Sequence, residues 1–237
     1  MFQKTMPKLI DHIELATGPE PKGTIIWMHG LGADCWDFVS IVKELGLPED
    51  LPLRYIFPQA PTRSISINNG QRMPGWYDIT LSELQDGPAR KADEAGVRES
   101  QEFINALIAR EATRGIASDK IVVAGFSQGG AIALQTGLRH PQPLAGVMAL
   151  STYLPLENSL ATERTLANAN IPILMAHGTQ DPLVSVALAR LSRSKIEAQG
   201  YTVEWREYPM QHSVCMEEVT DIGAWLAKRF RSPIILA

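Results

Sequence analysis

The chain has 237 residues, 45% of them hydrophobic and 20% charged, with a formal net charge of −4 at pH 7. This composition is ordinary for a globular protein, and Lys and Arg are not clustered into the basic face that nucleic-acid binding usually requires. Only two cysteines are present, Cys35 and Cys215, and the N-terminus lacks the apolar core of a signal peptide. We therefore expect a cytoplasmic protein without a disulfide framework. No segment approaches the ~20 apolar residues that span a bilayer, so we expect no stable membrane insertion.

Short apolar runs followed by turn residues recur along the chain. In chain order they predict strands at residues 24–28, 55–57, 121–124, 147–150 and 171–176. Runs this short suit strands that are buried on both faces, as in a parallel sheet. Residues 8–15 and 202–208, near the two ends, predict further strands that are less buried. Apolar residues at helical spacing predict helices around residues 97–108 and 219–230, and a further helix should end at His140 because Pro141 cannot continue it. The alternation predicts one α/β domain over residues 1–237, with a mostly parallel central sheet and helices on both faces.

One segment departs from this alternation. Residues 58–88 contain several turn-forming sequences, among them Asn-Asn-Gly at 68–70 and Met-Pro-Gly at 73–75, and they predict a long ordered loop. Loops of this length in compact domains are usually functional. The apolar side chains of the segment would either line a groove for an acyl chain or pack the loop onto the body of the protein, and the sequence favours neither. These side chains are Met73, Trp76, Ile79 and Leu81.

The sequence Gly125-Phe126-Ser127-Gln128-Gly129 matches the pattern G-x-S-x-G. It follows a predicted buried strand and opens a predicted helix, which is the setting of the nucleophile elbow in α/β-hydrolases. This setting predicts Ser127 as a nucleophile. The alternatives are a glycine-rich turn with Ser127 as a helix N-cap, and a phosphate-binding loop, although the pattern G-x-x-x-x-G-K is absent.

A serine nucleophile needs a base, and in α/β-hydrolases the acid and then the histidine follow the serine along the chain. His212 is the only histidine after Asp181, and it lies between the last predicted strand and the last helix. It is therefore the predicted base. Three alternatives remain open: a solvated loop histidine, a metal site shared with Cys215, and His177 as the base with Glu157 or Glu163 as its acid.

Asp181 follows the predicted strand at residues 171–176, where the acid of such a triad belongs. The competing interpretation is structural, because Asp181-Pro182 before a helical run is typical of an N-cap followed by proline at the first helical position. We expect the two roles to exclude each other, since a carboxylate that holds an imidazole should not also point down its own helix.

Acyl transfer also needs donors directed at the developing oxyanion. One is expected from the backbone N–H of Gln128, directly after the nucleophile, and the other from a loop after an early strand. The sequence His29-Gly30-Leu31-Gly32 occupies that loop and predicts the Leu31 N–H as the second donor. The alternative is an ordinary turn that ends a strand.

With these pieces in place, the chain resembles the carboxylesterase/acyl-protein thioesterase family, also called phospholipase/carboxylesterase. The matching segments run in family order: HGLGAD (29–34), FPQAP (57–61), INNGQRMPGWYDI (67–79), GFSQGGAIAL (125–134), LSTYLP (150–155), HGTQDPLV (177–184) and HS (212–213). Two departures lie near the acyl site, Pro209 where the family usually has glycine and Gly75 where it often has alanine.

The resemblance implies a triad of Ser127, Asp181 and His212, an oxyanion hole at Leu31 and Gln128, and no metal or cofactor. It implies a serine carboxylesterase that hydrolyses carboxylic esters, with thioesters of S-acylated proteins and lysophospholipids as further substrates. The expected partner is therefore a small-molecule ester or an acylated protein or lipid. A peptidase or lactone hydrolase on the same fold and a non-catalytic binding protein are the alternatives, and the sequence leaves monomer and homodimer open.

Overall fold

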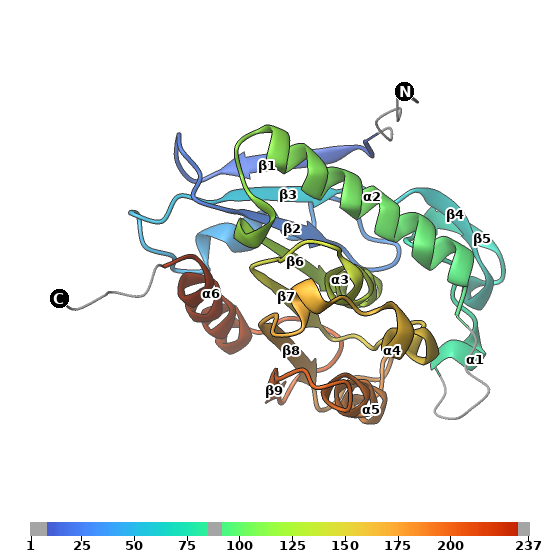
Figure 1. The fold of residues 1–237 in the computed structure, drawn as a ribbon. Helices are drawn as coiled ribbons and strands as arrows, with labels where there is room; N and C mark the ends of the chain where they lie inside the picture. The colour runs from blue at the N-terminus through green and yellow to red at the C-terminus, as the bar shows by residue number, and fades with distance from the viewer. Residues whose placement is uncertain (1–8, 85–91, 232–237) are drawn as a thin grey trace, which may run out of the picture.

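The computed structural model describes residues 9–84 and 92–231, and its centre is a seven-stranded sheet (Figure 1). The strand order is β1-β3-β2-β6-β7-β8-β9. Strand β1 is antiparallel to β3, and every other neighbouring pair is parallel. The strands are β1 (His12–Ala16), β2 (Thr24–Met28), β3 (Arg54–Pro58), β6 (Ile121–Phe126), β7 (Gly146–Leu150), β8 (Ile173–Gly178) and β9 (Val203–Tyr208).

The short apolar runs are explained by the way their alternate side chains enter two separate cores. In β2, Ile25 and Trp27 pack into the cluster on one face of the sheet, whereas Ile26 and Met28 pack into the cluster on the other. Successive side chains of a strand point to opposite faces, so a strand covered on both sides must be apolar at every position. The predicted parallel sheet with helices on both faces is confirmed.

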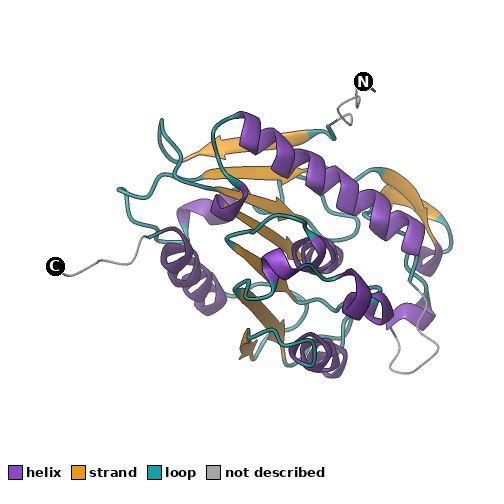
Figure 2. Cartoon of the chain, viewed as in Figure 1, coloured by secondary structure: helices purple, strands orange, loops and turns teal. Residues whose placement is uncertain are grey.

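Figure 2 shows the helices arranged around this sheet. Helices α2 (Glu94–Thr113), α3 (Gln128–Arg139) and α5 (Val186–Glu197) supply apolar side chains to one face. Helix α6 (Met216–Phe230) and the 3-10 turn η1 (Ser40–Lys43) cover the other. Helix α3 ends before Pro141, as the sequence predicts. Short elements complete the described chain: α1 (Leu81–Leu84), α4 (Leu160–Glu163), η2 (Ser66–Asn68), η3 (Ser118–Lys120), η4 (Glu157–Ser159) and η5 (Leu166–Asn168).

A buried carboxylate fixes α2 to the sheet. The Glu111 side chain is fully buried, and it accepts hydrogen bonds from Thr24 Oγ1 on β2 and Arg54 Nη1 on β3, both at 2.6 Å. Arg114 Nη1 donates to its other oxygen at 2.8 Å. A buried charge is tolerated when it is paired and hydrogen-bonded in this way. Among helices within residues 9–84 and 92–231, none is both long and apolar enough to cross a bilayer.

The long ordered loop expected over residues 58–88 contains regular secondary structure in its middle part, which the sequence did not predict. Strands β4 (Thr62–Ile65) and β5 (Gln71–Pro74) pair there as an antiparallel hairpin, and α1 follows. Their sequences lack an apolar alternation because most of the hairpin is exposed or half-buried. The turn that joins them uses positive φ angles at Asn69 (54°) and Gly70 (77°), residue types that tolerate this conformation. Residues 85–88 of the predicted loop, and residue 8 of the first predicted strand, lie outside the described residues.

Candidate active site

Ser127 occupies a strained turn between β6 and α3. Its φ is 53° and its ψ −120°, a conformation that costs a non-glycine residue about 1–3 kcal/mol. Two contacts hold it in place: the Ser127 N–H donates to Leu150 O at 2.8 Å, and Thr152 Oγ1 donates to Ser127 O at 2.6 Å. The side chain of Ser127 caps no N–H of α3, so the N-cap alternative does not describe it.

The turn requires glycine on both sides of the serine. A Cβ at Gly125 would lie 2.2 Å from the backbone of Gly129, and one at Gly129 would lie 2.5 Å from Met28 O. Neither side chain fits without moving backbone atoms. The glycines of the motif therefore allow strand β6, helix α3 and strand β2 to approach one another.

His212 lies in the loop between β9 and α6, and its ring contacts both other members of the predicted triad. Its Nε2 lies 2.9 Å from Ser127 Oγ, and its Nδ1 lies 2.6 Å from Asp181 Oδ2. The ring also packs against Phe126, with 4.8 Å between centroids. Within the described part of the chain, no three His, Cys, Asp or Glu side chains are grouped to hold a metal ion, so the site shared with Cys215 has no support.

The Asp181 carboxylate divides its two oxygens between two tasks. Oδ2 accepts from His212, while Oδ1 accepts from the backbone N–H groups of Leu183 and Val184, both at 2.9 Å. The N-cap of α5 is Ser185, whose hydroxyl accepts from the Leu188 N–H. The competing interpretation of Asp181 as the N-cap of this helix is therefore wrong. The expectation that capping and holding the imidazole exclude each other stays a prediction, because Asp181 does not cap the helix. The carboxylate closes a turn that precedes the helix.

A second histidine lies against the same carboxylate. His177 Nε2 lies 2.8 Å from Val184 O and 3.4 Å from Asp181 Oδ2, and the His177 side chain is buried. Burial alone would raise the pKa of Asp181, but hydrogen bonds from His177, His212 and the Val184 N–H outweigh it and hold the pKa well below its usual value. Asp181 is thus a stable anion.

The alternative in which His177 is a base with Glu157 or Glu163 finds no support. Glu163 accepts from Arg98 and Arg139, and Glu157 pairs with Lys195. Neither carboxylate bonds to His177, which faces Asp181 instead.

The two predicted oxyanion donors lie beside Ser127. Leu31 and Gln128 both line the same cavity as Ser127, and neither backbone N–H has a hydrogen-bond partner among the described residues. Unpaired N–H groups at the first turn of a helix and in a loop are the arrangement that an oxyanion hole uses.

The loop that carries Leu31 is held by the buried ring of His29. The His29 Nδ1–H donates to Gly30 O at 2.7 Å, while Nε2 accepts from the Ala60 N–H at 3.1 Å. Only the neutral ring can do both, because an imidazolium has no acceptor. Burial, the largest influence, lowers the pKa of His29, although Gly30 O and the nearby Asp37 and Asp34 oppose it.

A largely apolar cavity of about 350 Å³ opens beside Ser127 and His212. Of the four expected acyl-site residues, Met73 and Ile79 line it. The other two predictions are wrong, for opposite reasons: Trp76 is fully buried behind the cavity wall, and Leu81 is 67% exposed on α1. Hydrophobicity alone did not tell which way these side chains face. The remaining lining residues are Gly30, Leu31, Ala33, Asp37, Ile67, Asn68, Leu84, Phe126, Gln128, Tyr153, Leu183 and Val184.

Several residues that line this cavity were not predicted from the sequence, although their positions at or after the ends of predicted strands indicate them. Phe126 precedes the nucleophile, Leu183 and Val184 follow Asp181, and Tyr153 follows strand β7. Each lies after or at the end of a parallel strand, where the sheet places its ligand-binding loops.

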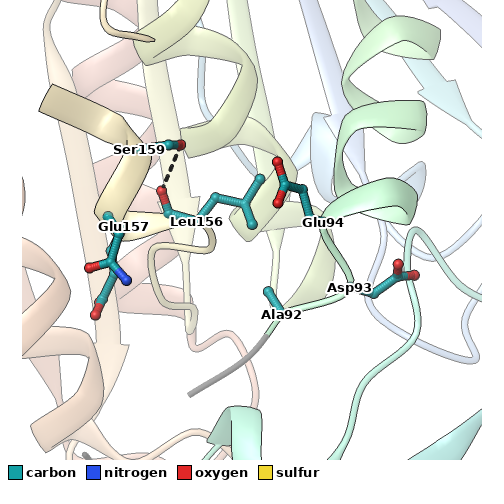
Figure 3. A pocket seen from close by; sticks show the side chains of 7 residues that line it. Ala92, Asp93, Glu94, Leu156, Glu157 and Ser159 are labelled. Atoms are coloured by element: carbon teal, nitrogen blue, oxygen red, sulfur yellow. Dashed lines mark hydrogen bonds between the residues drawn. The ribbon is translucent and has the colours of Figure 1, made fainter. Parts of the chain in front are cut away.

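A larger hollow of about 430 Å³ lies elsewhere, between the start of α2 and the turn η4 (Figure 3). It is lined by Ala92, Asp93, Glu94, Leu156, Glu157, Asn158 and Ser159. Its hydroxyl, Ser159 Oγ, donates to Leu156 O and contacts Glu163 rather than a histidine. Size does not make it a site for acyl transfer, because the Glu163 carboxylate beside the hydroxyl is paired with Arg98 and Arg139 and is therefore a weak base.

The phospholipase/carboxylesterase family matches the chain over residues 12–230. The chain belongs to this family. Acyl-protein thioesterase 1 of Neurospora crassa is 40% identical to it over 211 residues, which cover 87% of this chain and 86% of the relative. Acyl-protein thioesterase 1 of Mycosarcoma maydis is 37% identical over 226 residues, with 90% and 93% covered.

Crystal structures of related proteins share the fold. SOBER1 of Arabidopsis thaliana has a TM-score of 0.82 and 28% identity, covering 88% of this chain and 99% of its own. Acyl-protein thioesterase 2 of Zea mays has a TM-score of 0.80 and 25% identity, covering 94% and 100%. The resemblance seen in the sequence is confirmed: the chain is a serine hydrolase of the α/β-hydrolase fold, from a family that cleaves esters and thioesters.

The neutral ring of His29 leads to a prediction about acid stability. Its folded pKa is lowered, so the unfolded chain takes up a proton on this residue at a higher pH than the folded protein does. The contribution of His29 to stability is therefore complete above about pH 6.5 and is lost as the pH falls below it. We expect the His29 ring resonances in NMR to titrate below about pH 6.5. The contribution of His29 to the free energy of unfolding should decrease from about pH 7 to about pH 5, whereas Glu218, whose pKa burial raises to about 8, contributes a change of the opposite sign. The decrease is therefore measured in a Glu218→Gln variant, which removes the opposing change.

Burial also lowers the pKa of His140, so its contribution to the free energy of unfolding likewise decreases as the pH falls. A His140→Asn variant lacks this contribution, and the decrease due to His29 should remain. Titration of the His29 ring at or above about pH 6.5 would contradict the assignment of Nε2 as an acceptor.

Proposed function

We propose that the protein hydrolyses carboxylic esters and acyl thioesters with Ser127 as nucleophile, His212 as base and Asp181 as the acid that orients the base. The observation that carries the proposal is the continuous hydrogen-bonded chain from Ser127 Oγ through both ring nitrogens of His212 to the buried Asp181. A serine hydroxyl is a poor nucleophile until such a base accepts its proton.

The geometry supports the following sequence of steps. His212 Nε2 takes the proton of Ser127 Oγ as that oxygen attacks the acyl carbon. The Leu31 and Gln128 N–H groups stabilise the oxyanion, and the imidazolium then protonates the departing alcohol or thiol. Water attacks the acyl-enzyme with His212 again as base, which releases the carboxylic acid. Asp181 holds the Nδ1–H tautomer and stabilises the imidazolium, because its own pKa stays low.

The cavity supports an acyl chain as the group recognised. Its wall beside Ser127 is formed mainly by apolar side chains, among them Ile67, Met73 and Ile79. The relatives named acyl-protein thioesterase 1 support thioesters of S-acylated proteins as substrates beside simple esters. Lysophospholipids share the same acyl group and are a further substrate class to compare.

The nucleophile is tested with a fluorophosphonate probe, which reacts with activated serines. We expect the wild-type protein to be labelled, and Ser127→Ala to lose both labelling and ester turnover, leaving at most the residual rate that binding and the oxyanion hole provide. Equal labelling of the two proteins would refute Ser127 as the nucleophile. A Ser159→Ala variant serves as the control, since its hydroxyl lies in the other hollow.

The orienting role of Asp181 is tested by Asp181→Asn. The amide oxygen can still accept from the Leu183 and Val184 N–H groups, but an amide NH₂ facing His212 favours the wrong ring tautomer. We expect kcat to fall about 10⁴-fold while Tm changes little. The matched control is Ser185→Ala, which removes the true cap of α5 and should cost about 1 kcal/mol of stability with kcat unchanged. If Asp181→Asn lowers Tm and spares kcat, Asp181 has only a structural role.

Acyl-chain recognition is tested with p-nitrophenyl acetate, butyrate, hexanoate and octanoate. Each buried CH₂ contributes about 0.8 kcal/mol, so kcat/KM should rise by up to about fourfold per CH₂ until the chain outgrows the cavity. Ile79→Ala should flatten this rise because Ile79 lines the cavity, whereas Leu81→Ala should not because Leu81 lies outside it. A kcat/KM that falls steadily from acetate onward would exclude the cavity as the acyl site.

A further inference from the structure

The segment of residues 74–77, here called the clamp segment, contacts both parts of the chain that carry the proposed oxyanion donors: the loop with Leu31 and the start of α3 with Gln128. On the side of the Leu31 loop, Pro74 O accepts from the Gly32 N–H at 2.9 Å. The Trp76 indole Nε1–H donates to His29 O, also at 2.9 Å. The position of the Leu31 N–H is therefore fixed from both sides, because Gly32, the next residue, and His29, two residues earlier, are both bonded to the clamp segment.

On the other side, the clamp segment bonds to the side chain of Gln128. The Trp76 backbone N–H donates to Gln128 Oε1 at 2.7 Å, and Gln128 Nε2 donates to Tyr77 O at 2.7 Å. One amide side chain thus pairs with a donor and an acceptor on the same backbone stretch. Only one orientation of the amide satisfies both bonds, so the side chain is fixed in rotation as well as in position.

These bonds are shielded from water. Trp76 and Tyr77 are fully buried, and Gln128 and His29 are 1% and 2% exposed. In such surroundings a hydrogen bond is electrostatically stronger than in water, and the loss of one partner leaves the other unsatisfied at a cost of about 1–3 kcal/mol. The connection between the Leu31 loop and the start of α3 is rigid for this reason.

The clamp segment is itself anchored from its outer side. Ser100 Oγ on α2 donates to Trp76 O, and Arg63 Nε donates to Gly75 O at 2.7 Å. Gly75 allows close packing, since a Cβ there would lie only 3.0 Å from side-chain carbons of both Leu31 and Ile65. The segment therefore connects α2 and the β4–β5 hairpin to the Leu31 loop and to the start of α3.

We infer that Trp76 and the side chain of Gln128 are positioning residues that set the separation of the Leu31 and Gln128 N–H groups. This inference rests on the function proposed above, in which those two N–H groups stabilise the oxyanion. Donors must lie about 2.7–3.1 Å from the oxyanion, and an error near 1 Å can cost about 10²-fold in rate. Gln128 thus has two roles: its backbone N–H contacts the reacting oxygen, and its side chain holds that N–H at a fixed position relative to the Leu31 N–H.

The two roles of Gln128 can be separated, because substitution of the side chain leaves the backbone N–H in place. Gln128→Met keeps side-chain length and helix propensity but removes both clamp bonds. The matched control is Gln135→Met, two turns further along α3, where an equally buried glutamine bonds to Gln101 at 2.9 Å, away from the site. Both variants bury a methionine in place of a bonded amide.

For each variant we would measure kcat and KM with one p-nitrophenyl ester, Tm, and the inhibition constant of a trifluoromethyl ketone, whose adduct with serine places an oxyanion in the hole. Gln128→Met should lower kcat about 10-fold to 100-fold, leave KM within about threefold, and weaken the ketone in proportion to kcat/KM. Gln135→Met should lower Tm less, because it breaks one bond and removes an amide oxygen that has no partner, and it should leave kcat and ketone binding within about twofold. Equal kcat and equal ketone binding in the two variants would overturn the inference.

A second pair of variants covers the case in which Gln128→Met does not fold. Trp76→Phe removes the indole bond to His29 O, and Trp225→Phe is its control, a buried tryptophan on α6 at the opposite face of the sheet. Only Trp76→Phe should weaken ketone binding. The two proposals fail separately: if Ser127→Ala retains turnover, the proposed function is wrong, whereas if Ser127 is required but neither clamp variant affects kcat, only the positioning inference is wrong.

Discussion

Ser127 is held at a positive φ between a buried strand and a buried helix, and the rest of the candidate site is arranged around that turn. The strain of about 1–3 kcal/mol is offset by two short hydrogen bonds to Leu150 and from Thr152, each contributing about 0.5–1.5 kcal/mol. In this conformation the Ser127 side chain does not cap the helix and contacts His212 instead. Gly125 and Gly129 make the turn possible, since any Cβ there would collide with backbone.

The buried charge of Asp181 is the second constraint. Its side chain is fully buried, and an isolated carboxylate in such surroundings would take up a proton. Four donors prevent this: two backbone N–H groups on one oxygen, and His212 with the more distant His177 on the other. The turn that follows β8 therefore does more than end a strand. It keeps Asp181 ionised, and the ionised carboxylate in turn fixes the ring of His212.

Much of this arrangement is encoded locally and was predictable from the sequence. Ser127, Asp181 and His212 each follow a strand that the sequence predicts, and a parallel sheet brings the carboxyl ends of its strands to one edge, so their proximity follows from topology. Features that depend on which way a side chain faces were not predictable. Trp76 and Leu81 are both apolar members of one segment, yet one is buried in the body and the other is exposed. Ser185 and Asp181 both precede α5, and only the backbone geometry shows which one caps it.

The bonds between Gln128 and the clamp segment could not be predicted from the sequence, for a related reason. They join residues more than fifty positions apart, and both partners on the clamp segment are backbone atoms, which leave no trace in the sequence. Their effect nevertheless explains why a long, mostly polar excursion is kept ordered here. An oxyanion hole works only if its donors are in place before charge develops, because reorganising them during the reaction would consume the stabilisation they provide. The two proposed donors follow different strands, Leu31 in the loop after β2 and Gln128 at the start of α3 after β6, and the sheet alone fixes only where those strands end. The proposed oxyanion hole therefore calls for a rigid bridge outside the sheet, and residues 74–77 form bonds to both of these parts of the chain.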